Sequence, residues 1–187
     1  SVILTLTNHE PFELPVASRF KGEEDGNKFK STAFYTDSCL GAFIDHAKTQ
    51  VWYKNTLFVV VADHGHRLPK NQYEVYHPNR YRIPLLFFGD VIKPEFRGVK
   101  ISKVGSQTDI ATTLFNQMNI ASTDYTWSKD LLNPEVEGHA FFSWDNGFGF
   151  VNGKDQAISF DNVSRQLIYK SEGLAKNEEV SLLTRGK

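Results

Sequence analysis

Residues 57–66 read Leu-Phe-Val-Val-Val-Ala-Asp-His-Gly-His: six apolar positions followed at once by an acid, two histidines and a glycine. Apolar residues at consecutive positions are typical of a strand that is buried on both faces, as in parallel sheets covered by helices. In open α/β sheets, ligands bind outside the carboxyl ends of such strands. The stretch therefore predicts an α/β fold with a candidate site at Asp63, His64 and His66.

Strands and helices alternate on both sides of this stretch. Residues 2–6 (Val-Ile-Leu-Thr-Leu) and 83–88 have the aliphatic composition of strands. Between residue 6 and the buried stretch, apolar side chains recur at spacings of three and four, which predicts a helix over about residues 31–50. A capping box of Ser106 and Asp109 begins a second expected helix. This order predicts an α/β sheet.

The end of the chain has a different sequence pattern from the residues before it. Over residues 138–170, short apolar runs are separated by Asn-Gly and other turn residues, so we expect three or four antiparallel strands there. Acidic residues at 178 and 179 favour the start of a final short helix that ends near residue 186. We therefore expect two domains, residues 1–137 and residues 138–187.

Charge and cysteine content exclude several classes of protein. Lys and Arg number 21 against 22 Asp and Glu, so there is no basic excess, and nucleic acid is not an expected partner. The single cysteine, Cys39, excludes an internal disulfide, and we expect a semi-buried thiol in mid-helix. The longest apolar run, residues 57–62, is too short to span a membrane. Because an apolar segment follows Ser1 directly and the only methionine is Met118, we interpret the chain as a piece of a longer protein.

Asp63 and His64 are the strongest candidates for chemistry. Charged and imidazole side chains are costly at the end of a core strand unless they are paired or bind a metal. One carboxylate oxygen beside one imidazole nitrogen suits Zn²⁺ or Mn²⁺. Two alternatives remain open: a strand end with solvated polar residues, and a compact metal cluster of Asp63, His64 and His66.

Two further loops carry candidate residues. His9, within Thr-Asn-His-Glu-Pro-Phe at 7–12, directly follows the first expected strand. In a parallel sheet it would lie on the same edge as Asp63. Arg80 and Arg82 suit an anionic group, although a solvated surface charge is the more common role of a loop arginine.

Four ordered segments resemble the sulfatase branch of the alkaline-phosphatase superfamily, most closely lipoteichoic acid synthases and phosphoglycerol transferases. They are Thr7–Phe12 (similar to T-N-H-x-P-F), Tyr35–Ile44 (Y-x-D-x-x-L-G-x-F-I), Val59–Gly65, and Gln107–Leu114 (Q-x-D-I-x-P-T-L, with Thr112 at the usual proline). The resemblance implies an alkaline-phosphatase-like, mostly parallel sheet with helices on both faces and a small C-terminal antiparallel sheet. Only the C-terminal portion of that domain is expected here.

The same resemblance implies roles for individual residues. Asp63 and His64 would bind a divalent metal ion (Mn, Mg, Ca or Zn), His9 would lie near the phosphate group of the substrate, and His66 would line the pocket. The family's nucleophile precedes the T-N-H segment, so we expect it upstream of Ser1, together with another acidic metal ligand. Cys39 lacks the sequence context of a sulfatase nucleophile, so no catalytic nucleophile is expected in this chain.

The implied function is that of a metal-dependent hydrolase or transferase acting on small-molecule or lipid-linked phosphate or sulfate esters. Without the N-terminal half of its own domain, the chain is expected to be inactive. The resemblance also implies a membrane-anchored protein whose catalytic domain lies outside the cytoplasm. The alternative function is a non-catalytic binding or structural module with the same fold.

Overall fold

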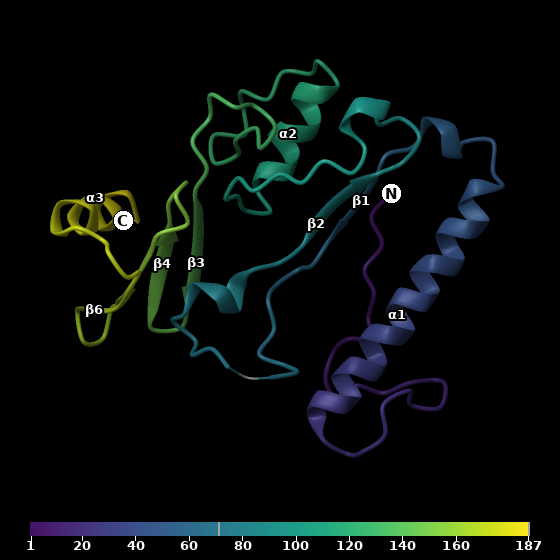
Figure 1. Cartoon of the computed structure of the whole chain (residues 1–187), viewed down its shortest axis with the longest axis horizontal. Helices are drawn as coiled ribbons and strands as arrows, with labels where there is room; N and C mark the ends of the chain where they lie inside the picture. The colour runs from purple at the N-terminus through teal and green to yellow at the C-terminus, as the bar shows by residue number, and fades with distance from the viewer. Residues whose placement is uncertain (71, 187) are drawn as a thin grey trace. The chain divides into compact units, whose positions relative to one another are not determined.

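The computed structural model describes residues 1–70 and 72–186 (Figure 1). Its helices are α1 (Asp25–Lys48), α2 (Asp109–Gln117) and α3 (Lys176–Gly186), and 3₁₀ turns η1, η2 and η3 cover Tyr53–Asn55, Pro78–Tyr81 and Pro94–Phe96. Its strands are β1 (Phe58–Val61), β2 (Leu85–Phe88), β3 (Ala140–Trp144), β4 (Gly147–Val151), β5 (Ala157–Asp161) and β6 (Gln166–Lys170). Strands β1 and β2 form one sheet, and β3 to β6 form a second, antiparallel sheet in sequence order. The α/β class and the C-terminal antiparallel sheet are confirmed.

The described residues pack as two compact units. Unit 1 comprises residues 1–60, 66–72 and 84–97, and unit 2 comprises residues 61–65, 73–83 and 98–187. The chain passes from one unit to the other within β1 and returns after Gly65. The expected boundary between residues 137 and 138 does not coincide with this division, and it stays a prediction.

The core of unit 2 lies on both faces of the antiparallel sheet. Phe150 and Ile158 pack with Leu174 and Leu182, which belong to the C-terminal segment and α3. Helix α3 lies against β4 and β5 (Figure 1). The strand neighbours of those two residues, Val151 and Ala157, belong to a separate cluster on the other face, together with Phe142, Tyr81 and Tyr169. The sheet is therefore covered by α3 on one face and by residues 73–83 on the other.

Unit 1 holds α1 and most of the sheet of β1 and β2. The rings of Phe58 and Phe88 stack at 4.9 Å across that sheet, and Phe43 of α1 approaches Phe58 edge-on at 6.3 Å. Ala47 is fully buried, but Phe43 remains 42% exposed. The apolar face predicted for α1 is thus only partly covered by the described residues. No helix in the described part of the chain is both long and apolar enough to cross a bilayer.

Two expectations for unit 1 are wrong. Residues 2–6 form no strand, and the side chains of Val2, Ile3, Leu4 and Leu6 are at least 72% exposed. Strand composition is insufficient because the backbone N–H and C=O groups also need a neighbouring strand, and none of the described strands pairs with this segment. Cys39 is exposed rather than semi-buried, because residues 38–43 in the middle of α1 are all exposed, Leu40 and Phe43 of the expected apolar face included.

Candidate functional site

Asp63 and His64 stand at a bend directly after β1. Neighbouring side chains of an extended strand point to opposite faces, so two adjacent residues converge only where the backbone bends. Here His64 Nε2 lies 3.6 Å from Asp63 Oδ2, and Asp63 Oδ1 accepts a 2.9 Å hydrogen bond from the His64 backbone N–H. Both side chains are largely exposed, at 79% for Asp63 and 66% for His64. The bend therefore presents both groups to the same side.

The backbone of Gly65 selects the tautomer of His64. His64 Nδ1 lies 2.9 Å from the carbonyl oxygen of Gly65. A carbonyl oxygen only accepts, so Nδ1 carries the hydrogen, and in the neutral ring Nε2 carries the lone pair. A backbone carbonyl that orients the ring through its other nitrogen is the usual arrangement for a histidine that binds a metal. The nitrogen that faces Asp63 is thus the one suited to coordination.

The separation of these two ligand atoms fits a shared cation. Two donor atoms about 2.1 Å from a tetrahedral ion lie about 3.4 Å apart, close to the observed 3.6 Å between Asp63 Oδ2 and His64 Nε2. Among residues 1–70 and 72–186, no group of three or more His, Cys, Asp and Glu side chains is arranged to hold a metal. The compact cluster of Asp63, His64 and His66 is therefore not formed among these residues, and a role of the Asp63–His64 pair as metal ligands stays a prediction.

Two contacts hold the bend to the rest of unit 2. The Gln107 amide nitrogen donates to the carbonyl oxygens of Ala62 and Asp63, both at 2.6 Å. The backbone of Gly65 packs directly on Arg80 in η2, where an added Cβ would lie 2.0 Å from the carbonyl oxygen. Only glycine allows this close approach.

The segment that supports Gly65 is itself fixed to the antiparallel sheet. The Ser159 hydroxyl donates to the Tyr76 carbonyl at 2.6 Å, and the Tyr81 ring stacks on Phe142 at 4.4 Å. Arg82 donates to both carboxylate oxygens of Asp155, at 2.6 and 2.5 Å. The C-terminal sheet therefore acts as a scaffold for residues 73–83, and through them for the bend.

The two loop arginines are thus engaged within the protein. Arg80 donates to the Tyr73 carbonyl at 3.2 Å, in a partly buried position, and Arg82 forms the fork with Asp155. Neither is a purely solvated charge, and both help to fasten residues 73–83.

The start of α2 is anchored by a buried ion pair. Asp109 is fully buried, and its Oδ2 accepts from the Ser106 N–H at 2.7 Å, which is one half of the predicted capping box. The same carboxylate accepts from the Lys129 backbone at 3.0 Å and pairs with Lys129 Nζ at 2.6 Å. Sequence reasoning identified the Gln107–Leu114 segment but assigned no role to Gln107, and no local pattern pointed to Lys129.

His9 lies in unit 1, in the turn of residues 7–11. Its Nδ1 lies 2.7 Å from the Glu10 carbonyl oxygen, so Nδ1 carries the hydrogen and Nε2 the lone pair in the neutral ring. His9 lines a shallow hollow of about 280 Å³, together with Leu6, Thr7, Glu10, Pro11 and Glu13. His9 is therefore exposed and accessible from this hollow.

His66, also in unit 1, is held among aromatic rings. It stacks on Phe29 of α1 at 4.8 Å and meets the edge of Phe12 at 6.1 Å. Its Nδ1 accepts from the Leu68 N–H at 3.0 Å, which leaves the hydrogen on Nε2 in the neutral ring. Arg67 pairs with Glu10 at 3.2 Å. The structure thus joins the loop after β1 to the turn that carries His9, within unit 1.

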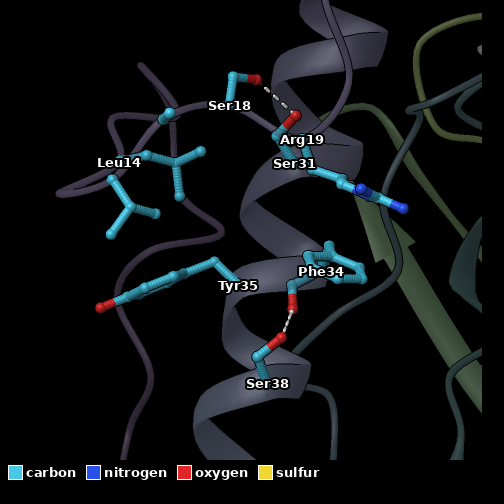
Figure 2. A pocket seen from close by; sticks show the side chains of 9 residues that line it. Leu14, Ser18, Arg19, Ser31, Phe34, Tyr35 and Ser38 are labelled. Carbon is cyan, nitrogen blue, oxygen red and sulfur yellow. Dashed lines mark hydrogen bonds between the residues drawn. The ribbon is translucent and has the colours of Figure 1, made fainter.

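A second hollow in unit 1, also of about 280 Å³, lies between residues 14–19 and α1 (Figure 2). Figure 2 shows the Ser18 and Ser31 hydroxyls hydrogen-bonded at 2.7 Å, and the Ser38 hydroxyl donating to the Phe34 carbonyl at 2.8 Å. None of the predicted site residues lines this hollow, so it is separate from the candidate site.

Comparison with known proteins agrees with this architecture. The chain is 27% identical over 151 residues to the lipoteichoic acid synthase-like protein YvgJ of Bacillus subtilis (strain 168), which covers 71% of this chain and 24% of that protein. Its fold matches the crystal structure of a protein in the alkaline phosphatase superfamily from Vibrio parahaemolyticus, with a TM-score of 0.70 and 23% identity over 97% of this chain and 45% of that one.

The chain thus spans about a quarter of the curated relative and less than half of the solved structure. The family model described as Sulfatase matches residues 1–120, which include both loops and the start of α2. This chain therefore belongs to the sulfatase family, with the fold of the alkaline-phosphatase superfamily.

Proposed function

We propose that this chain is the C-terminal part of a metal-dependent hydrolase or transferase that acts on phosphate or sulfate esters, with Asp63 and His64 as two ligands of its divalent cation. The observation that carries the proposal is the convergence of Asp63 Oδ2 and His64 Nε2 to 3.6 Å at the end of β1. The family assignment and the resemblance to a lipoteichoic acid synthase-like protein support an ester as substrate. A phosphoglycerol-transferase-like reaction is the specific form that we favour.

Asp63 and His64 differ in what each would contribute to the binding of a divalent cation. A bound divalent cation supplies Lewis acidity, which lowers the pKa of a hydroxyl nucleophile and polarises the ester oxygen. Asp63 contributes the negative charge that holds the cation, and His64 contributes a neutral nitrogen whose ring is oriented by Gly65. The nucleophile and the remaining ligands are proposed to lie on residues that precede this chain in the complete protein. That portion would be the partner that completes the domain.

His9 and His66 are proposed to bind the substrate, a role that rests on the resemblance of their segments to the family. With Nδ1–H directed at the Glu10 carbonyl, His9 presents Nε2 outward, and in the protonated ring this nitrogen donates to an anionic oxygen or a leaving group. His66 carries its hydrogen on Nε2 and is suited to the same task. We further propose that the complete protein is membrane-anchored with this domain outside the cytoplasm.

The test is a Mn²⁺ titration of the complete gene product, followed by electron paramagnetic resonance, together with hydrolysis of p-nitrophenyl phosphate and p-nitrophenyl sulfate. Asp63→Asn and His64→Gln are expected to raise the Kd for Mn²⁺ at least about tenfold and to abolish hydrolysis, because each removes a ligand. His46→Gln, on the exposed surface of α1, is the matched control and should leave both unchanged. The isolated 187-residue chain is expected to hydrolyse neither ester.

The proposal fails if Mn²⁺ affinity is insensitive to both Asp63→Asn and His64→Gln. Binding that depends on the pair, without turnover of any phosphate or sulfate ester by the complete protein, would instead favour the non-catalytic module.

A further inference from the structure

We propose that Gln107 is a positioning residue for the Asp63–His64 pair: its side-chain amide holds the bend that turns both groups to one side. The proposal rests on the proposed function, since it concerns how the pair is presented to the cation. The observation that carries it is the double hydrogen bond from one nitrogen of Gln107 to the carbonyl oxygens of Ala62 and Asp63.

The two bonds define the backbone conformation at the end of β1. Successive carbonyl groups of an extended strand point in opposite directions, so a single donor reaches two of them only where the strand has ended. Gln107 Nε2 lies 2.6 Å from both oxygens. Because both partners only accept, the amide nitrogen rather than the amide oxygen has to face them. Gln107 therefore holds Ala62 and Asp63 in a conformation that is incompatible with a continued strand.

That conformation is the one that metal binding needs. Asp63 and His64 are adjacent, so in an extended chain their side chains would diverge. With the carbonyls of residues 62 and 63 drawn to one donor, the bend follows at Asp63 and His64, and their ligand atoms approach to 3.6 Å. The link from Gln107 to the ligand pair thus runs through two peptide groups and no other side chain.

Gln107 is itself held firmly enough to act in this way. It lies two residues before the fully buried Asp109, whose carboxylate accepts hydrogen bonds from Ser106 and Lys129. The Ile110 N–H also donates to the Gln107 carbonyl at 3.2 Å. The start of α2 is therefore an anchored base, and the side chain of Gln107 extends from it to the end of β1.

Because Gln107 is exposed, an effect on metal binding can be distinguished from an effect on the stability of the fold. The residue lies on the surface, where water competes for hydrogen bonds, so its two bonds add little to the stability of the fold. Their effect on the direction of the adjacent carboxylate and imidazole does not depend on burial. Removal of the amide should therefore change metal binding much more than it changes unfolding.

The experiment compares Gln107→Met, of similar length but without donors, with Gln117→Met at the exposed last residue of α2. In the complete gene product, the Kd for Mn²⁺ is measured by electron paramagnetic resonance, and the Tm is measured without metal in the presence of a chelator. Gln107→Met is expected to raise the Kd about tenfold and to broaden the spectrum of the bound ion. Its metal-free Tm should stay within about 2 °C of the parent, as should that of Gln117→Met. Gln107→Ala provides a second truncation should methionine disturb the fold.

An unchanged Kd in both Gln107 variants overturns the inference, as does an equal loss of affinity in Gln117→Met. A lower metal-free Tm with unchanged affinity also overturns it, because Gln107 would then serve the fold alone. Asp63→Asn in the same series separates the two proposals. If Asp63→Asn leaves Mn²⁺ binding intact, the proposed metal site fails; if it abolishes binding while Gln107→Met does not weaken it, only the positioning role fails.

Discussion

Gly65 packs so closely on Arg80 that a Cβ atom at position 65 would lie 2.0 Å from the Arg80 carbonyl oxygen. Van der Waals contact needs more than 3 Å, and the contacted atom belongs to the backbone of η2, which the antiparallel sheet holds in place through Tyr76, Tyr81 and Arg82. The glycine that follows Asp63 and His64 is thus required by packing, and the bend is coupled to a sheet made of residues more than 70 positions later.

Gly65→Ala is expected to destabilise the protein by about 2 kcal/mol, because the methyl group forces the backbone of residues 63–65 away from η2. Gly41→Ala is the matched control: nothing lies within 4 Å of its added Cβ, and alanine is favoured over glycine within a helix by about 1 kcal/mol. Urea unfolding should therefore show opposite signs for the two substitutions. Equal effects would contradict the close packing of Gly65.

Asp109→Asn should cost about 3 kcal/mol of unfolding free energy, because it leaves the Lys129 ammonium largely buried without its counter-charge. Asp45→Asn in α1 removes the carboxylate of an exposed ion pair with Lys48 and should change stability by less than about 0.5 kcal/mol. Both are measured by chemical denaturation. A loss of less than about 1 kcal/mol in Asp109→Asn would show that the buried pair does not anchor α2.

The Arg82–Asp155 fork is partly solvated, with side chains 61% and 52% exposed, so its coupling energy should not exceed about 1 kcal/mol. A double-mutant cycle of Arg82→Gln and Asp155→Asn measures it. Asparagine is chosen because Asp155 has a φ of 62°, which asparagine adopts more readily than most residues. A coupling of 2 kcal/mol or more would mean that the fork is a principal support of residues 73–83.

Acid is expected to destabilise unit 2 through two histidines. Burial lowers the pKa of His77 below its ordinary 6.5, and burial, followed by the charge of Lys129, lowers that of His139. As the pH falls through 6.5, the unfolded chain takes up protons that the folded chain resists, so stability is full above that pH and declines below it.

Each histidine contributes a slope of at most about 1.4 kcal/mol per pH unit. His77→Gln and His139→Gln should each flatten the pH dependence of unfolding between about pH 5 and 7. The same substitution at His46, on the exposed surface of α1, controls for the replacement of a histidine by glutamine. A slope that neither His77→Gln nor His139→Gln alters would contradict this account.

Several elements could be predicted because their signals are local. The consecutive apolar residues before Asp63 indicated β1, and the structure places it at Phe58–Val61. Asn-Gly turns indicated the hairpins of β3 to β6. The strand expected at residues 2–6 was wrong, because a strand depends on a neighbour as well as on composition. The start of α1 was placed six residues too late, because its polar first turns carry no apolar periodicity.

The candidate site could likewise be predicted only where its signals are local in the sequence. Residue types and their position after a buried strand were enough to single out Asp63 and His64, since the preference of a metal for oxygen and nitrogen ligands is a property of the side chains themselves. His9 was singled out by the resemblance of its segment to the family, because the strand expected before it does not form. The supports of the pair depend on three-dimensional packing: Gln107 reaches carbonyls 44 and 45 positions earlier, and Arg80 meets Gly65. Contacts between distant segments leave no periodicity in the chain, so only the folded arrangement could reveal which residues hold the bend.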